Sequence, residues 1–220
     1  MDSRFASPGD LGHFLHYGGA GGTHELDSDF VIVDVETSGL DPAKGARVIE
    51  IAAVRISKAG AEVGHMSSLV NPGDGETGAS WIHGISPEMI SDAPQFREVF
   101  DSFAELLDDA IFVAHHAKFD EGFIASEVRL AGLNLTLMPG LCTYWLARAR
   151  VIGTQNLKLG TLAEHFGISQ LGAHSALDDA RVVSQLMPYL LDQYDPVTYF
   201  SKEVTQPRNG IGAEPFPRKS

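Results

Sequence analysis

Two carboxylates, Asp34 and Glu36, stand two residues apart directly after the apolar run Phe30-Val31-Ile32-Val33. Side chains two apart in a strand point to the same face of a sheet, so both acids would share one face. Like charges this close repel each other and lose hydration, so they need protons, cationic partners or a metal ion. The alternative is that the strand ends here and the acids lie in water, because residues 37–42 have the composition of a turn.

Two further acids lie where helices are expected to begin. Asp120 follows the buried strand expected at 111–114, at a place where an aspartate is also common as a helix cap. In the helix expected over 175–191, a helical projection places Asp179 near the middle of the apolar face and Asp178 toward solvent. A carboxylate within an apolar face is costly unless it is paired or bound to metal, so Asp179 is the expected ligand. His174 precedes this helix, and the projection does not fix its direction.

These residues together form a set of four carboxylates and one histidine on three separated elements. Clusters of oxygen ligands suit hard divalent cations such as Mg²⁺ or Mn²⁺ better than Zn²⁺. The chain has a single cysteine, Cys142, and no pair of cysteines that would indicate zinc. The sequence therefore predicts a magnesium or manganese site, provided that the fold brings the three elements together.

The elements that must position these residues alternate in a way that is typical of an α/β domain. Residues 30–35, 48–56 and 62–70 are predicted to be strands and to form an antiparallel meander. Helices are predicted over 96–107, 119–130, 157–166 and 175–191, with a short strand at 111–114. This order favours a mixed sheet flanked by helices.

The composition limits the class of protein. The chain has 220 residues, with 16 Lys plus Arg against 29 Asp plus Glu, which gives a net charge of −13. This acidity argues against a protein that coats nucleic acid by neutralising phosphates, but not against a small site that meets nucleic acid through metal ions. A single cysteine fits a reducing compartment, so we expect a cytoplasmic protein, and no apolar run is long enough for a membrane span.

Both ends of the chain are expected to lie outside the folded domain. Residues 1–27 are rich in glycine and are interpreted as a flexible leader, and residues 193–220 as a polar C-terminal tail. The predicted domain covers residues 28–192.

In their order along the chain, these motifs resemble the DEDDh family of 3′→5′ exonucleases, in particular its DnaQ-like members related to the epsilon subunit of DNA polymerase III. The resemblance rests on three motifs, which are Asp34-Val35-Glu36-Thr37-Ser38-Gly39-Leu40-Asp41-Pro42, Ala114-His115-His116-Ala117-Lys118-Phe119-Asp120 and His174-Ser175-Ala176-Leu177-Asp178-Asp179-Ala180. It covers residues 28–192 and implies a ribonuclease H-like fold with a mixed five-stranded sheet flanked by helices. The family's third-motif aspartate falls on Asp179, in agreement with the helical projection.

The resemblance implies an enzyme that releases nucleoside 5′-monophosphates from the 3′ ends of single-stranded or frayed DNA, in proofreading or repair. It implies two Mg²⁺ (or Mn²⁺) ions per site. Asp34, Glu36 and Asp179 would hold one ion. Asp34 would bridge to the second, with Asp120 helping directly or through water. His174 would be the general base.

The resemblance also implies where the substrate binds. The turn after the two acids would meet the terminal sugar through its backbone, and Gly39 permits a close approach and a positive φ. Two residues of a second segment, His83 and Ile85, would touch the terminal nucleotide. Phe119 would either pack behind the active site or be an ordinary core residue. The expected substrate-binding residues are thus Thr37, Ser38, Gly39, Leu40, His83, Ile85 and Phe119.

Two other functions remain open at this point. An exoribonuclease similar to oligoribonuclease or RNase T would use the same chemistry on an RNA 3′ end. Thr37 favours DNA, because oligoribonuclease-like proteins usually have methionine after the glutamate. A non-catalytic accessory subunit of a DNA polymerase could lose its acids without penalty. All five catalytic positions are filled here, which argues against binding to a polymerase as the only role.

Overall fold

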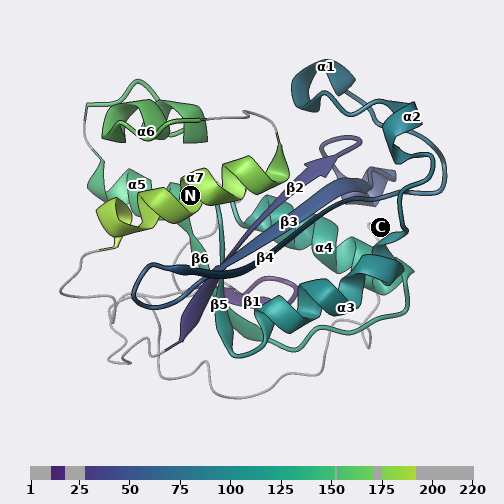
Figure 1. Ribbon diagram of the computed structural model, residues 1–220, viewed down its shortest axis with the longest axis horizontal. Coiled ribbons are helices and arrows are strands. Elements are labelled where there is room, and N and C mark those ends of the chain that lie inside the picture. Colours follow the sequence, from purple (N-terminus) through teal and green to yellow (C-terminus); the bar gives the residue numbers. More distant parts are fainter. Residues whose placement is uncertain (1–10, 18–27, 152, 171–174, 192–220) are drawn as a thin grey trace, which may run out of the picture.

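One mixed six-stranded sheet forms the centre of the protein. The computed structural model describes residues 11–17, 28–151, 153–170 and 175–191, and its strand order is β1-β6-β5-β2-β3-β4 (Figure 1). The predicted antiparallel meander is confirmed, with β2 (Asp29–Thr37), β3 (Val48–Ile56) and β4 (Glu62–Leu69) pairing in that order. On the other side of β2, parallel pairing adds β5 (Ala110–Ala114), β6 (Met138–Cys142) and β1 (Leu15–Tyr17).

Helices cover both faces of this sheet (Figure 1). Alternate residues of β2 divide between the two faces, because Val31 and Val33 belong to one buried cluster and Phe30 and Ile32 to the other. The Val31 face packs against α3 (Phe96–Leu107) and α4 (Lys118–Leu130). The opposite face packs against α5 (Thr143–Arg150), α6 (Leu159–Phe166) and α7 (Ala176–Leu190).

Three short helices complete the described structure. They are η1 (Pro42–Lys44), α1 (Ser80–His83) and α2 (Pro87–Ile90). The four longer helices predicted from periodicity all occur within two residues of their expected ends. Among the described residues, no helix has the length and apolar character needed to cross a bilayer.

The sheet has six strands where the resemblance implied five, and the strand β1 comes from the segment interpreted as a flexible leader. Glu121 of α4, only 1% exposed, accepts hydrogen bonds from the amides of Phe14 and Leu15, both at 2.8 Å, and from the Tyr17 hydroxyl at 2.7 Å. Phe14 also packs edge-on against Phe112 of β5. The expectation of a flexible leader is therefore wrong for residues 11–17, because a buried carboxylate and the apolar core hold them in place. The remaining domain boundaries stay a prediction.

Candidate active site

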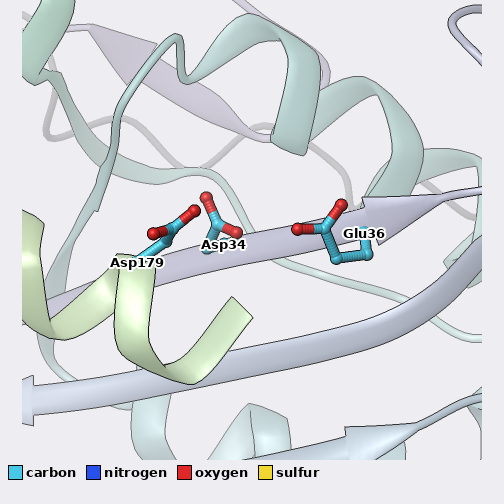
Figure 2. Close-up of side chains that lie close together, drawn as sticks. All are labelled: Asp34, Glu36 and Asp179. Carbon is cyan, nitrogen blue, oxygen red and sulfur yellow. The ribbon is translucent and has the colours of Figure 1, made fainter. Parts of the chain in front are cut away.

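Three carboxylates that are far apart in the sequence converge at one place. Asp34 and Glu36 project from β2 and Asp179 from the first turn of α7, and one oxygen of each lies within 4.8 Å of the others (Figure 2). The ligand set consists only of oxygen atoms on half-buried side chains, which suits a hard divalent cation. The residues present therefore fit the predicted metal site.

The packing of α7 on the sheet explains this convergence. Asp34 continues the face of β2 that carries Phe30 and Ile32, and this is the face that α7 covers. The apolar side of α7 that the projection predicted is buried, as Ala180, Val183 and Leu186 show. Asp179 thus points toward the acids of β2, whereas Asp178 is outside the carboxylate cluster. Asp178 is half-buried, so the expectation that it lies in solvent is only partly met.

The fourth predicted acid, Asp120, lies beside this cluster at the start of α4. It is 3% exposed, and its negative charge raises the pKa of Asp34. Burial in turn raises the pKa of Asp120, while hydrogen bonds from its own amide and from that of Val35 partly oppose the rise. Asp120 therefore contributes charge next to Asp34, although it is not one of the three acids whose oxygens converge.

A further acid, Glu50, was missed by the reading of the sequence. It lies directly across from Glu36 in the β2–β3 ladder, and its Oε2 atom accepts a hydrogen bond of 3.2 Å from the amide of Ala176. This bond ties the first turn of α7 to β3, so Glu50 positions the helix that carries Asp179. Only the register between β2 and β3 could have revealed Glu50, and periodicity alone does not fix a register.

The electrostatics of the cluster favour binding of a cation. Burial is the largest cause that raises the pKa of Asp34, followed by the charges of Asp120, Asp179, Glu36 and Glu50. For Glu36, burial together with the nearby Glu50 and Asp179 raises the pKa to about 7. Each acid thus makes its neighbours harder to ionise, and a divalent cation would relieve this repulsion.

The raised pKa of Glu36 predicts that the stability of the metal-free protein depends on pH. Between the unfolded value of about 4.3 and about 7, the folded state holds more protons than the unfolded state, so stability falls as pH rises. In EDTA, the melting temperature should therefore decrease from pH 5 to pH 8, and Glu36→Gln should flatten this decrease. The matched control Glu105→Gln, on the exposed side of α3, should leave the curve unchanged. A melting temperature that rises over this range would contradict the assignment.

The turn after the acids is fixed mainly by its own hydrogen bonds. Ser38 and Arg47 bond to each other twice, from the Ser38 amide to the Arg47 carbonyl at 2.9 Å and from the Arg47 amide to Ser38 Oγ at 3.0 Å. Thr37 Oγ1 donates to the Gly39 carbonyl at 2.7 Å, and Leu40 is exposed. A Cβ on Gly39 would lie 3.1 Å from that of Ala46, and Gly39 is not among the residues with positive φ. A close approach of Gly39 to the terminal sugar stays a prediction.

The other predicted substrate residues are largely occupied within the protein. His83 is 8% exposed; its Nδ1 accepts from the Ile85 amide at 3.1 Å, and its Nε2 lies 3.0 Å from the Thr77 carbonyl. Ile85 packs with Ile49 in a small buried cluster. Phe119 packs against Phe123 and the core, which favours the interpretation as a core residue. Contact of these three side chains with a nucleotide stays a prediction.

The predicted general base, His174, lies outside the described residues, as do most of the predicted leader and all of the predicted tail. The structure begins again at Ser175, whose carbonyl accepts a hydrogen bond of 3.0 Å from the Asp179 amide. The role of His174 therefore rests on its place in the third motif, five residues before Asp179.

Comparison with known proteins identifies the relatives of this chain. A sequence model described as "Exonuclease", of the RNase T type, matches residues 31–187. The chain is 33% identical over 169 residues to the DNA polymerase III subunit epsilon of Aquifex aeolicus, covering 76% of this chain and 83% of that protein. It is 34% identical over 171 residues to the 3′-5′ exonuclease DinG of Bacillus subtilis, covering 77% of this chain but 18% of DinG.

A solved structure agrees with the sequence relatives. Exonuclease X in complex with 5′ overhanging duplex DNA superposes with a TM-score of 0.54 at 25% identity, over 73% of this chain and 90% of that protein. The fold is ribonuclease H-like, as in other solved exonucleases that match at lower identity. The chain spans less than one fifth of the length of several curated relatives.

These matches and the geometry agree. The exonuclease family generally uses divalent metals, and the acidic cluster of this chain can bind one. The matched range of 31–187 begins within β2 and ends within α7, so it includes all four predicted acids. The chain belongs to the DnaQ-like, RNase T-type family of 3′→5′ exonucleases.

Proposed function

We propose that this chain is a metal-dependent 3′→5′ exonuclease that releases nucleoside 5′-monophosphates from the ends of single-stranded or frayed DNA. The observation that carries the proposal is the convergence of Asp34, Glu36 and Asp179 within 4.8 Å in a chain of the exonuclease family. DNA is favoured over RNA because relatives include a DNA polymerase III subunit and an exonuclease solved with DNA. These names also support a role in proofreading or repair, with a DNA polymerase as a partner.

Each residue of the site has a role in this proposal. Asp34, Glu36 and Asp179 would hold Mg²⁺ or Mn²⁺, with Asp120 beside Asp34 and two ions per site. When bound, the metal supplies positive charge to the phosphate and lowers the pKa of the attacking water. His174 would accept the proton of that water as general base. An unperturbed histidine has a pKa of about 6.5 and is therefore largely neutral at cellular pH.

The turn at 37–40 would orient the 3′ end. Its backbone amides follow Glu36 directly, and its conformation is held by the paired hydrogen bonds between Ser38 and Arg47. A turn that is fixed before the substrate binds loses little entropy when it contacts the terminal sugar. Thr37, Ser38, Gly39 and Leu40 would therefore place the last phosphodiester bond over the acids.

Two other functions make different predictions. An exoribonuclease would use the same acids and would differ only in its preference for ribose. A non-catalytic accessory subunit would have no need to keep mutually repelling carboxylates in a half-buried cluster, because such a cluster destabilises the fold. The retained cluster therefore favours catalysis over a purely structural role.

The direct test is a nuclease assay with single-stranded DNA and RNA of the same sequence, each labelled at the 5′ end. With Mg²⁺, we expect the DNA to shorten one nucleotide at a time from its 3′ end, with release of 5′-monophosphates and no shortening in EDTA. Asp34→Asn protein, purified in parallel, should be inactive and so excludes a contaminating nuclease. Shortening that is equally fast in EDTA, or no shortening at all, would refute the proposal. Faster loss of the RNA would favour the exoribonuclease.

A further inference from the structure

Trp81 is an aromatic residue whose exposure the fold does not explain. It is 84% exposed on α1, whereas the core holds most of the large apolar side chains of the described chain. The segment around it is anchored, because His83 is buried and bonded at both ring nitrogens, and Ile85 and Ile90 pack on Ile49. Trp81 is therefore presented to solvent from a fixed base.

This indole lies close to the candidate active site. The Cα hydrogen of Gly78 faces the turn that follows Glu36, since a Cβ on Gly78 would clash with the Ser38 carbonyl oxygen. Trp81 follows Gly78 by three residues, a length of chain that spans at most about 11 Å. Figure 1 shows α1 beyond the end of β2, the strand that carries Asp34 and Glu36. A single strand whose 3′ end lies at the acids would thus reach Trp81 within a few nucleotides.

The charges near the turn offer little grip on the phosphates of a single strand. Of the two cations that follow the turn, Arg47 is held by the buried Glu127 at 2.7 Å, whereas the exposed Lys44 forms only a surface pair with Asp41 at 3.4 Å. The chain as a whole carries a net charge of −13. Proteins hold single strands by a basic groove, by stacking bases on aromatic side chains, or by both. Where few cations are available, stacking has to supply more of the binding.

We infer that the indole of Trp81 is a stacking platform for a base of the single strand upstream of its 3′-terminal nucleotide. The inference rests on the proposed function and deepens it, because it assigns a contact that favours a single strand over a paired one. Every base has a flat face, so the platform would accept any of the four bases. Removing one such stack is expected to weaken binding about 5- to 150-fold.

The first experiment compares a long and a short substrate. An oligonucleotide with a 3′-terminal phosphorothioate measures binding by anisotropy, and the 4-nitrophenyl ester of thymidine 5′-monophosphate measures hydrolysis without an upstream base. Trp81→Ala should weaken oligonucleotide binding about 5- to 150-fold and leave ester hydrolysis within about twofold of the unmodified protein. Trp81→Phe should retain most of the binding. Leu130→Ala, an exposed apolar residue at the end of α4, is the matched control and should change neither.

The second experiment uses fluorescence and locates the base. The chain has two tryptophans, so Trp145→Phe leaves Trp81 as the only one. Its emission should be quenched by the oligonucleotide. Separate oligonucleotides carry an abasic site at the second, the third or the fourth position from the 3′ end. One of them should fail to quench the emission, and its abasic position identifies the stacked base. The same abasic site should remove the difference in affinity between the unmodified protein and Trp81→Ala.

The outcomes separate this inference from the proposed function. If the ester is hydrolysed with Mg²⁺ but Trp81→Ala binds the oligonucleotide normally, the inference is wrong and the proposed function stands. If the unmodified protein hydrolyses neither the ester nor an oligonucleotide without the phosphorothioate, the proposed function is wrong, and the inference that rests on it is wrong as well. If no oligonucleotide quenches Trp81 and sedimentation shows dimers that Trp81→Ala dissociates, Trp81 belongs to a protein interface and the inference is overturned.

Discussion

Asp179→Asn is expected to lower the rate of 3′-end hydrolysis by about 10³-fold or more. Charge stabilisation by a bound metal supplies several kcal/mol, and each 1.36 kcal/mol corresponds to about a tenfold change in rate. The same substitution should raise the melting temperature of the metal-free protein, because it removes one charge from mutually repelling carboxylates. The increase in melting temperature on adding Mg²⁺ should be largely lost. Steady-state kinetics and thermal denaturation with and without Mg²⁺ measure these effects.

Asp178→Asn is the matched control for this prediction. Asp178 is the sequence neighbour of Asp179 on the first turn of α7, but it is outside the converging cluster. We expect its substitution to change the rate by less than about threefold, in line with a residue that does not hold the metal. A larger loss for Asp178→Asn than for Asp179→Asn would show that the third-motif acid has been assigned to the wrong residue.

His174→Ala is expected to lower turnover by about 10²- to 10⁴-fold, the usual contribution of a general base. Because this side chain is not a proposed metal ligand, the Mg²⁺-dependent increase in melting temperature should be the same as in the unmodified protein. The pH–rate profile should also lose its limb near the pKa of an ordinary histidine. This combination distinguishes a base from a ligand, since loss of a ligand would reduce both turnover and the response to Mg²⁺.

His165→Ala provides the control for removal of a histidine. His165 is exposed on α6, nine residues before His174, and takes no part in the proposed chemistry. Its substitution should leave turnover within about twofold of the unmodified protein. Normal turnover in His174→Ala would exclude His174 as the base and would require another acceptor for the proton.

The sequence predicted those elements whose pattern is local and strongly periodic. The apolar stripe of 96–107 predicts its helix to the residue, because side chains at helical spacing must share one buried face. The unbroken apolar run of β2 likewise predicts a central strand covered on both faces. Weaker patterns were missed, including β6, which contains Pro139 and Gly140, and the three-residue strand β1.

Pairing between distant segments explains what the sequence could not give. The sequence places residues 11–17 in a glycine-rich leader. In the structure they are held by hydrogen bonds to Glu121, which lies more than a hundred residues away along the chain. Nothing in the sequence distinguishes Glu50 from the other acids. The register of β3 places it opposite Glu36. Neither fact can be derived from periodicity, which describes the face of an element and not its partner.

The amino-acid sequence by itself indicated which side chains could form the metal site, because the order of the motifs selected Asp34, Glu36, Asp120 and Asp179. The helical projection independently selected Asp179 over Asp178. The tertiary structure decided how these acids meet. It brought Asp179 to the β2 acids, kept Asp120 beside rather than among them, and buried His83 and Ile85 while leaving Trp81 exposed. The reason is physical: the choice of residue types is local, whereas convergence, burial and electrostatic repulsion depend on how helices pack on a sheet whose register is set by long-range contacts.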